Sequence, residues 1–213
     1  MTPALYIVLG LIGVGIVGLI WRLSSCRHEL PCPSWLGWMV EMDNPFTKVN
    51  RARDIVELLQ LEPGMQVLDA GCGPGRLTLP LAEAVGSQGE VVALDVQDGM
   101  LARVHEKVQA AGLQNVRYLR AGLGEGKLPQ AHFDRALLVT VLGEIPDQVT
   151  ALKEIHGALK PGGILSVTEV IFDPHFQRRE TVSHVAQAAG FKEKNMFGGS
   201  LAYTLHLEKP NSG

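Results

Sequence analysis

The sequence predicts an α/β fold, in which a mostly parallel sheet with its last strand reversed follows a single transmembrane helix. Three observations support this fold class. Residues 4–21 are uncharged and almost entirely apolar, and residues 65–68 form a short apolar run that leads into an acid and a glycine-rich turn. Strand and helix patterns then alternate to the C-terminal end, as in βαβ units. We therefore divide the chain into a transmembrane anchor at 1–23, a juxtamembrane linker at 24–50 and an α/β domain at 51–213.

Composition indicates a globular domain with enough apolar material for its own core. The chain has 213 residues, of which 46% are hydrophobic and 19% charged. A net charge of −3 gives no basic surface for nucleic acid, so no nucleic-acid partner is expected. The cysteines Cys26, Cys32 and Cys72 fit neither a disulfide framework nor a zinc pattern, and the seven histidines lack metal-ligand spacing. We expect no metal.

The N-terminal apolar run is interpreted as an uncleaved anchor that contacts the lipid bilayer through residues 4–21. The run is about 18 residues long, which is near the lower limit for a helix that spans the hydrocarbon core of a bilayer. Tyr6 and Trp21 stand near its ends, where aromatic side chains favour the membrane interface. A cleaved signal peptide would need basic residues before the run, and a buried core helix would show a polar face. Because Arg22 and Arg27 follow the run, the positive-inside rule places the domain in the cytosol.

The linker is interrupted by proline and then becomes apolar. Pro31 and Pro33 end any helix that continues from the membrane. The segment 34–42 contains Trp35 and Trp38, three residues apart. Three interpretations remain open for it: a short helix packed on the domain, a segment at the membrane interface, or a cover over the ligand pocket.

Helices are predicted where apolar residues recur at helical spacing. The helix at 51–61 places Ile55, Leu58 and Leu59 on one face. The helix at 97–112 buries Met100, Leu101, Val104 and Val108, and it ends at Gly112. Further helices are predicted at 76–82, 149–159 and 177–189.

Strands are predicted in the apolar runs between these helices. They occupy residues 65–68, 91–95, 116–119, 133–140, 164–168, 192–197 and 201–208, with a loop at 121–129. The last two strands are joined by only Gly198, Gly199 and Ser200, which is a hairpin. The last strand must therefore run antiparallel to its partner.

The glycine-rich turn lies in Val67–Gly75, read Val-Leu-Asp-Ala-Gly-Cys-Gly-Pro-Gly. Its glycines allow the backbone to approach a ligand, and the next helix supplies free N–H groups. The dinucleotide fingerprint Gly-x-Gly-x-x-Gly is broken because Arg76 stands at the third glycine position, and Asp69 precedes the turn. These features favour a ligand with a cationic or hydroxylated part. Asp95 follows the turn by about 20 residues, where an acid binds ribose hydroxyls.

Together with Phe133-Asp134 and the Leu-Lys-Pro-Gly-Gly sequence at 159–163, these motifs resemble class I S-adenosylmethionine-dependent methyltransferases. Within that class the chain is most similar to the ubiquinone/menaquinone C-methyltransferases, and the resemblance extends from about Arg51 to Lys209. It implies a Rossmann-like class I methyltransferase sheet and S-adenosyl-L-methionine as the cofactor.

The resemblance also implies which residues bind the cofactor. They are Asp69, Gly71, Cys72, Gly73, Gly75, Asp95, Val96, Met100, Gly122 and Leu123. Asp69 is expected to orient the amino-acid end of the cofactor, and Asp95 its ribose. Many members carry an acid for the adenine amino group in the loop after the third strand. This chain has none at the equivalent position, which leaves the contact to Glu125 or to a backbone group.

Open α/β sheets bind ligands at the carboxyl ends of their strands, and four acids are predicted there: Asp69, Asp95, Glu144 and Glu169. Glu144 is the expected catalytic base or acceptor ligand. The alternative is that it caps the helix that starts near Asp147 or faces solvent. Glu169 and His175 are further candidates of the same kind.

The sequence thus predicts a membrane-anchored methyltransferase for a lipophilic small-molecule acceptor, either a quinone precursor or a lipid. Two alternatives stay open. One is a thiol S-methyltransferase, because a thiol of low pKa needs little help from a base. The other is a non-catalytic membrane-bound module that retains the fold.

Overall fold

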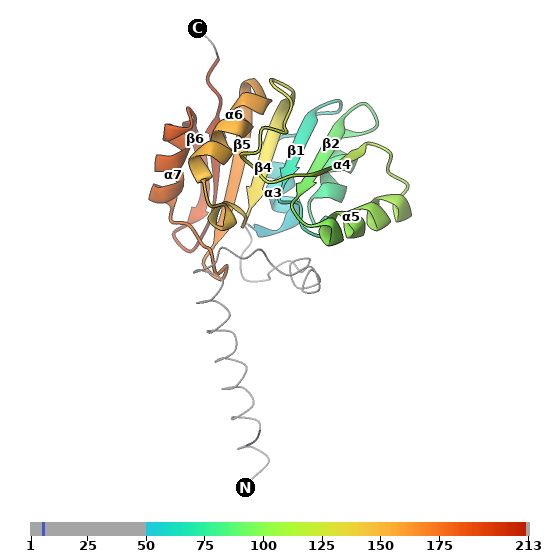
Figure 1. The fold of residues 1–213 in the computed structure, drawn as a ribbon, viewed down its shortest axis with the longest axis horizontal. Coiled ribbons are helices and arrows are strands. Elements are labelled where there is room, and N and C mark those ends of the chain that lie inside the picture. Colours follow the sequence, from blue (N-terminus) through green and yellow to red (C-terminus); the bar gives the residue numbers. More distant parts are fainter. Residues whose placement is uncertain (1–5, 7–49, 212–213) are drawn as a thin grey trace.

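In the computed structural model, which describes Tyr6 and residues 50–211, a seven-stranded sheet forms the centre of the molecule (Figure 1). Its strand order is β3-β2-β1-β4-β5-β7-β6. The strands are β1 (Gln66–Ala70), β2 (Glu90–Asp95), β3 (Val116–Arg120), β4 (Phe133–Val139), β5 (Leu159–Val170), β6 (Lys192–Gly199) and β7 (Ala202–Glu208). The helices are α3 (Ala52–Leu58), α4 (Thr78–Val85), α5 (Asp98–Ala110), the 3₁₀ turn η3 (Leu142–Glu144), α6 (Gln148–Ala158) and α7 (Arg179–Ala188).

The sheet is parallel except for one strand. β1 pairs in parallel with β2 and β4, and the outer pairs β2–β3 and β4–β5 are parallel too. β7 runs antiparallel to both of its neighbours, β5 and β6. The prediction of a reversed last strand is therefore confirmed, and the short β6–β7 hairpin is its cause.

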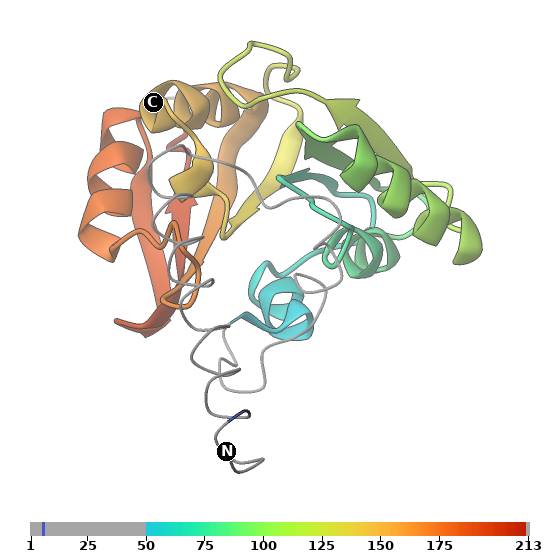
Figure 2. The ribbon, with the colours of Figure 1, turned by 60° about the horizontal axis from the view of Figure 1, so that its bottom comes forward.

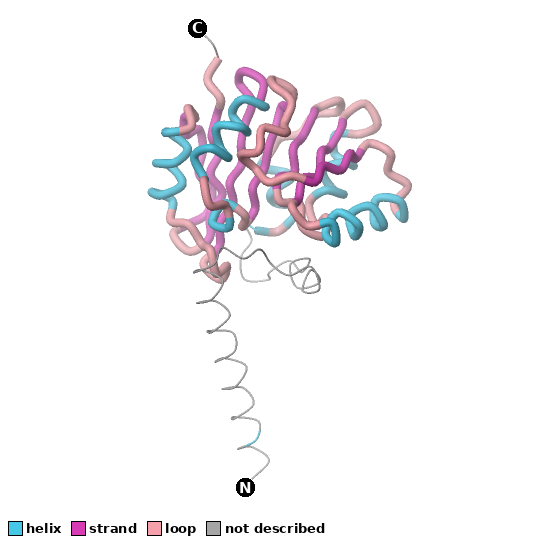
Figure 3. The backbone as a smooth tube through the Cα atoms, viewed as in Figure 1, coloured by secondary structure: helices cyan, strands magenta, loops and turns pink. Residues whose placement is uncertain are grey.

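Helices cover both faces of the sheet (Figure 3). Neighbouring residues of β1 point to opposite faces, and each belongs to a different apolar cluster. Leu68 lies in the cluster that includes side chains of α6 and α7. Val67 lies in the cluster formed with α3 and α4. Figure 2, which shows the ribbon from another direction, also places α3 (cyan) well apart from α7 (orange-red).

The predicted apolar stripes agree closely with the observed burial. All four residues of the α5 stripe are buried, and their spacing places them on one side of the helix. On the α3 face Ile55 and Leu59 are buried, whereas Leu58 is only half-buried. Burying a large aliphatic side chain contributes about 1.5–3 kcal/mol, which explains why these patterns hold their positions in the fold.

The fifth strand is longer than the predicted 164–168. The Lys-Pro-Gly-Gly sequence is part of β5 rather than a turn before it. Its backbone pairs with the end of the chain, because Gly162 N–H donates to the Lys209 carbonyl and Lys209 N–H donates to the Gly163 carbonyl, both at 2.9 Å. Gly162 has a φ of +75°, so this part of the strand is irregular and requires glycine.

The helix after the glycine turn starts two residues later than predicted, at Thr78. Arg76 is used instead to hold the chain before α3. Its Nη1 donates to the Asn50 carbonyl at 2.6 Å and its Nη2 to Asn50 Oδ1 at 3.0 Å.

The predicted anchor and linker lie outside the described residues, apart from Tyr6 and Asn50. None of the helices in the part that the structure describes is both long and apolar enough to cross a membrane.

Candidate active site

The glycine turn is built from three residues in the left-handed region. Gly71, Gly73 and Gly75 have φ values of +72°, +52° and +89°. A Cβ on Gly71 would lie 2.5 Å from Cγ2 of Val141, and one on Gly75 would lie 3.2 Å from Val104. A Cβ on Gly73 would meet no atom of the described chain within 4 Å. With respect to the described residues Gly73 therefore borders open space, while Gly71 and Gly75 pack against the protein.

Asp95 fixes this turn from the end of β2. It is buried, its Oδ2 accepts the Gly73 N–H at 3.0 Å and its Oδ1 accepts the Gln97 N–H at 2.9 Å. Burial raises the pKa of Asp95, although these N–H bonds oppose the rise. A carboxylate oxygen has two lone pairs, so each oxygen can still accept a hydroxyl. The acid predicted to bind ribose is thus also a structural part of the turn.

Asp69 links β1 to the next helix. Its Oδ2 accepts the hydroxyl hydrogen of Thr78 at 2.6 Å, and both side chains are buried. Burial raises the pKa of Asp69 to about 6, and the neighbouring Asp95 contributes to that rise. The role predicted for Asp69 at the amino-acid end of the cofactor stays a prediction.

Three other residues predicted to bind the cofactor differ in how exposed their side chains are. Cys72 is buried, and burial raises the pKa of its thiol, so it stays protonated and is not a nucleophile at neutral pH. Met100 is 2% exposed within the buried stripe of α5. Val96 is 48% exposed and directly follows Asp95, so it can contact a ligand at this edge.

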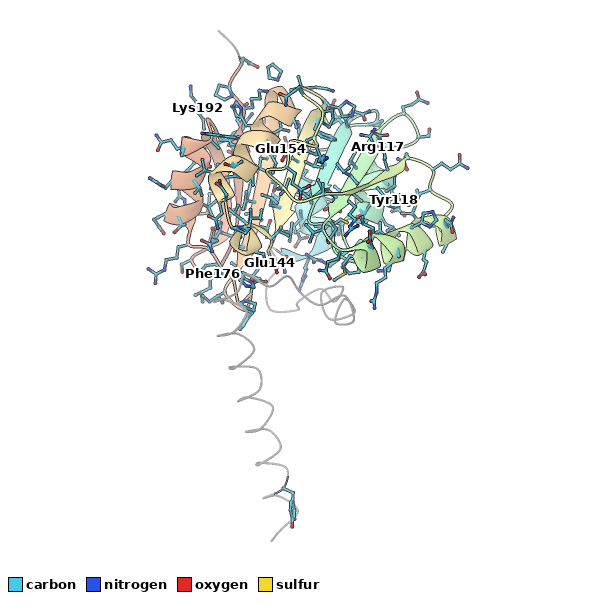
Figure 4. All side chains as sticks on the ribbon, viewed as in Figure 1. Arg117, Tyr118, Glu144, Glu154, Phe176 and Lys192 are labelled. Carbon is cyan, nitrogen blue, oxygen red and sulfur yellow. The ribbon has the colours of Figure 1, made fainter. Side chains whose placement is uncertain are left out.

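The loop with Gly122 and Leu123 is held by a residue that the sequence analysis missed. Glu154 of α6 accepts two backbone N–H groups, from Gly124 at 2.5 Å and from Leu128 at 3.0 Å. Figure 4 shows Glu154 beside the strands at the centre of the molecule. Glu125, the expected substitute for the missing acid, has its Oε1 2.9 Å from the place that a Cβ of Gly122 would take.

Acids and a histidine gather where β4 and β5 end. His175 Nδ1 lies 3.7 Å from Glu144 Oε1 and 3.9 Å from Asp173 Oδ1. Figure 4 labels Glu144 and Phe176, both at the lower edge of the domain in that view. Glu169, at the end of β5, is 1% exposed, and its Oε2 accepts the Gln177 N–H at 3.0 Å. We call Glu144, Glu169, Asp173 and His175 the acid–histidine cluster.

The helix-capping alternative for Glu144 is wrong. Asp147 itself caps α6, since its Oδ1 accepts the Thr150 N–H at 3.0 Å and its Oδ2 the Thr150 hydroxyl at 2.7 Å. Glu144 lies in η3, and its side chain is 21% exposed. The structure thus brings together the three residues that the sequence proposed for acceptor chemistry: Glu144, Glu169 and His175.

The turn after β4 connects the two halves of the site. At its start, Val141 packs against Gly71 of the glycine turn. Further on, a Cβ at Gly143 would overlap the carbonyl oxygen of His175. The acid–histidine cluster therefore lies one short turn away from the glycine turn. Within the described residues, no group of three or more His, Cys, Asp or Glu side chains is arranged to hold a metal ion.

Comparison with known proteins agrees with this geometry. Residues 67–163 match a family model described as a methyltransferase domain. A crystal structure of an S-adenosylmethionine-dependent methyltransferase from Aquifex aeolicus superposes with a TM-score of 0.74 at 22% identity, covering 84% of this chain and 99% of that one. The chain has the class I methyltransferase fold.

Two curated relatives each match about half of the chain. A demethylmenaquinone methyltransferase of Geobacillus stearothermophilus is 38% identical over 112 residues, covering 53% of this chain and 48% of the relative. The ubiquinone/menaquinone biosynthesis C-methyltransferase UbiE of Shewanella sp. (strain W3-18-1) is 37% identical over 118 residues, covering 55% and 47%. The chain thus spans about half the length of the curated relatives that it matches.

These proteins are described as methyltransferases, one of them as dependent on S-adenosylmethionine, so the site is compared with that cofactor. The residues fit that cofactor in two respects. Gly73 borders a space that a side chain would fill, and Asp95 retains acceptor capacity for ribose hydroxyls beside it.

Proposed function

We propose that this protein is an S-adenosylmethionine-dependent methyltransferase that acts on a lipophilic, quinone-like small molecule. The observation that carries the proposal is the open glycine turn, which Asp95 holds through Gly73, with the acid–histidine cluster one turn away. The quinone-like acceptor is supported by the names of the relatives, demethylmenaquinone methyltransferase and UbiE.

The bound cofactor would supply an electrophilic methyl group. Around it, the chain's own residues have three tasks: the glycine turn leaves room, Asp95 accepts ribose hydroxyls, and Asp69 orients the amino-acid end. Glu144 and His175 stand 3.7 Å apart at the acceptor side, where they can receive a proton from the acceptor. Positioning supplies much of the acceleration in such a transfer, because it replaces an encounter of two molecules by a fixed geometry.

We further propose that residues 1–23 anchor the enzyme in a membrane and that the domain faces the cytosol. Support comes from the uncharged run at 4–21 and from the arginines that follow it. A membrane location suits an acceptor that dissolves in lipid. In the same proposal, residues 34–50 cover the pocket mouth and admit acceptors from the bilayer side.

The proposal is tested with the full chain in detergent micelles. Calorimetry should detect binding of S-adenosylmethionine and S-adenosylhomocysteine but not of NAD. Labelled methyl groups should then be transferred to 1,4-naphthoquinol and not to thiophenol. Transfer only to the thiol would replace the quinone-like acceptor by a sulfur acceptor, and failure to bind either sulfur nucleoside would refute the enzyme.

A further inference from the structure

The end of β5 carries a buried carboxyl group with one unused oxygen. Glu169 is 1% exposed, and only its Oε2 is used, by the Gln177 N–H. Its Oε1 has no hydrogen-bond partner in the part of the chain that the structure describes. Buried polar atoms are nearly always paired, because leaving one unpaired weakens the fold. An oxygen in this condition at the ligand-binding edge of the sheet indicates a partner that arrives with the substrate.

The groups around Glu169 favour its neutral form. Burial, with smaller contributions from the carboxylates of Asp173 and Glu144, raises the pKa of Glu169 to about 8. Tyr203 is its cross-strand partner in β7, and the Tyr203 hydroxyl donates to the Gln177 carbonyl at 2.9 Å. Asp173 and Glu144 thus act on Glu169 from the loops after β5 and β4, and Tyr203 lies beside it in β7. At neutral pH Glu169 therefore holds its proton and can donate it in a hydrogen bond.

The position of this carboxyl relative to the glycine turn follows from two close contacts. Val141 packs on Gly71, and Gly143 packs on His175 without room for a Cβ. The turn Val141–Glu144 thus contacts the glycine turn at Gly71 and the loop that carries His175, so the cluster is separated from the glycine turn by this one short turn.

We propose, on the basis of the methyltransferase function proposed above, that Glu169 donates a hydrogen bond to an oxygen of the acceptor, which is a phenol or an enol. The proton of that acceptor hydroxyl passes to the pair formed by Glu144 and His175, while Glu169 keeps its own proton. A fixed donor at the oxygen stabilises the negative charge that develops there. A thiol accepts hydrogen bonds weakly and a hydrocarbon not at all, so Glu169 selects for oxygen.

The test measures binding of three probes of one shape to the full chain with S-adenosylhomocysteine present: 2-naphthol, naphthalene-2-thiol and naphthalene. Glu169→Gln retains an N–H donor, so its affinity for 2-naphthol at pH 6.5 should stay within about threefold of wild type. Glu169→Leu should weaken 2-naphthol binding by roughly tenfold or more and leave naphthalene unchanged. Ser166→Ala is the matched control. Ser166 lies in the same strand, and its buried hydroxyl oxygen also has no hydrogen-bond partner among the described residues.

The pH profile gives a second readout that needs only the conservative variant. Wild-type affinity for 2-naphthol should fall as the pH rises from 7 to 9, since Glu169 loses the proton that it donates, and Glu169→Gln should lack this fall. Wild-type affinity in the leucine variant, an equal fall in the glutamine variant, or no naphthol binding by the wild type would each overturn the assignment. If S-adenosylhomocysteine still binds in these cases, the methyltransferase function survives and only the role of Glu169 is wrong.

Discussion

Asp95 accepts the backbone N–H of Gly73 at 3.0 Å, so the acid at the end of β2 holds the turn that follows β1. The same side chain is the expected ligand of the ribose. Removing the Asp95 side chain should weaken cofactor binding in two ways, because the contacts to the ribose hydroxyls and the support of the glycine turn are lost together.

Asp95→Ala should therefore weaken binding of S-adenosylhomocysteine by about 1–3 kcal/mol, the usual loss for buried hydrogen-bonding groups left without partners. Isothermal calorimetry measures this directly. Asp98→Ala is the control: Asp98 is an exposed acid three residues further on, paired with Arg120 at 3.2 Å. Equal affinities for wild type and Asp95→Ala would remove Asp95 from the cofactor site.

Gly73→Ala tests the open space at the glycine turn. The added Cβ meets no described atom within 4 Å, so its effect on folding is the strain of a positive φ, about 1 kcal/mol. The added methyl group should still block the cofactor and lower its affinity by at least about tenfold, or 1.4 kcal/mol. Gly112→Ala is matched, since Gly112 has a φ of +69° and equally open surroundings but lies at the end of α5. If both variants bind the cofactor alike, the ligand does not lie against Gly73.

Glu154→Ala tests the support of the loop at 122–128. The change removes the acceptor of the Gly124 and Leu128 N–H groups, and bonds to a charged acceptor contribute about 1.5–3 kcal/mol each. We expect faster hydrogen exchange in residues 122–128 and roughly tenfold weaker cofactor binding. Lys153→Ala, an exposed neighbour on α6, should change neither. Unchanged exchange at Gly124 in the glutamate variant would contradict this role.

Protein stability should fall as the pH rises from about 4.5 to 8. Burial raises the pKa of Glu169 from its ordinary 4.5 to about 8, so the folded state binds this proton more tightly than the unfolded state. Stability from this group is full below pH 4.5 and is lost as the pH rises through the folded value, by an amount on the order of 5 kcal/mol. Thermal unfolding at a series of pH values should show the decline in wild type and a much flatter profile in Glu169→Gln. Parallel profiles for the two proteins would argue against a raised pKa at Glu169.

The proposed anchor predicts that the full chain stays with membranes after an alkaline carbonate wash. The reason is that residues 4–21 would be buried in hydrocarbon rather than held by surface charge. Protein that starts near Arg51 should appear in the soluble fraction and still bind the cofactor. Release of the full chain by the wash, or a mature N-terminus beyond Trp21, would disprove the anchor.

Sequence patterns predicted local structure well because local burial determined it. The α5 stripe is an example: its four apolar residues follow one helical face, and all are buried. The start of β5 was misplaced because Gly162 and Gly163 resemble a turn, whereas Lys209, far along the chain, pairs with them as a strand.

The sequence predicted those residues of the site that stand at the C-terminal ends of strands. Asp95 and Glu169 are examples, since a parallel sheet brings such positions to one edge. Glu154 was missed because its partner Gly124 is 30 residues away and no local pattern links them. The approach of His175 to Glu144 depends on Gly143, whose lack of a side chain lets two loops touch.

Because β7 is antiparallel to β5, the chain enters and leaves the domain at opposite edges of the sheet. Arg76, in the glycine turn, binds Asn50, so the polypeptide enters the domain at the reactive edge of the sheet. Glu208 pairs with Ile164, the first residue of β5 that pairs with β7, so the polypeptide leaves at the opposite edge (Figure 1). A fluorescent reporter or an affinity tag fused after Lys209 would therefore not obstruct the entry of substrate. Immobilising the protein on a surface through that end would leave the reactive edge exposed to solution.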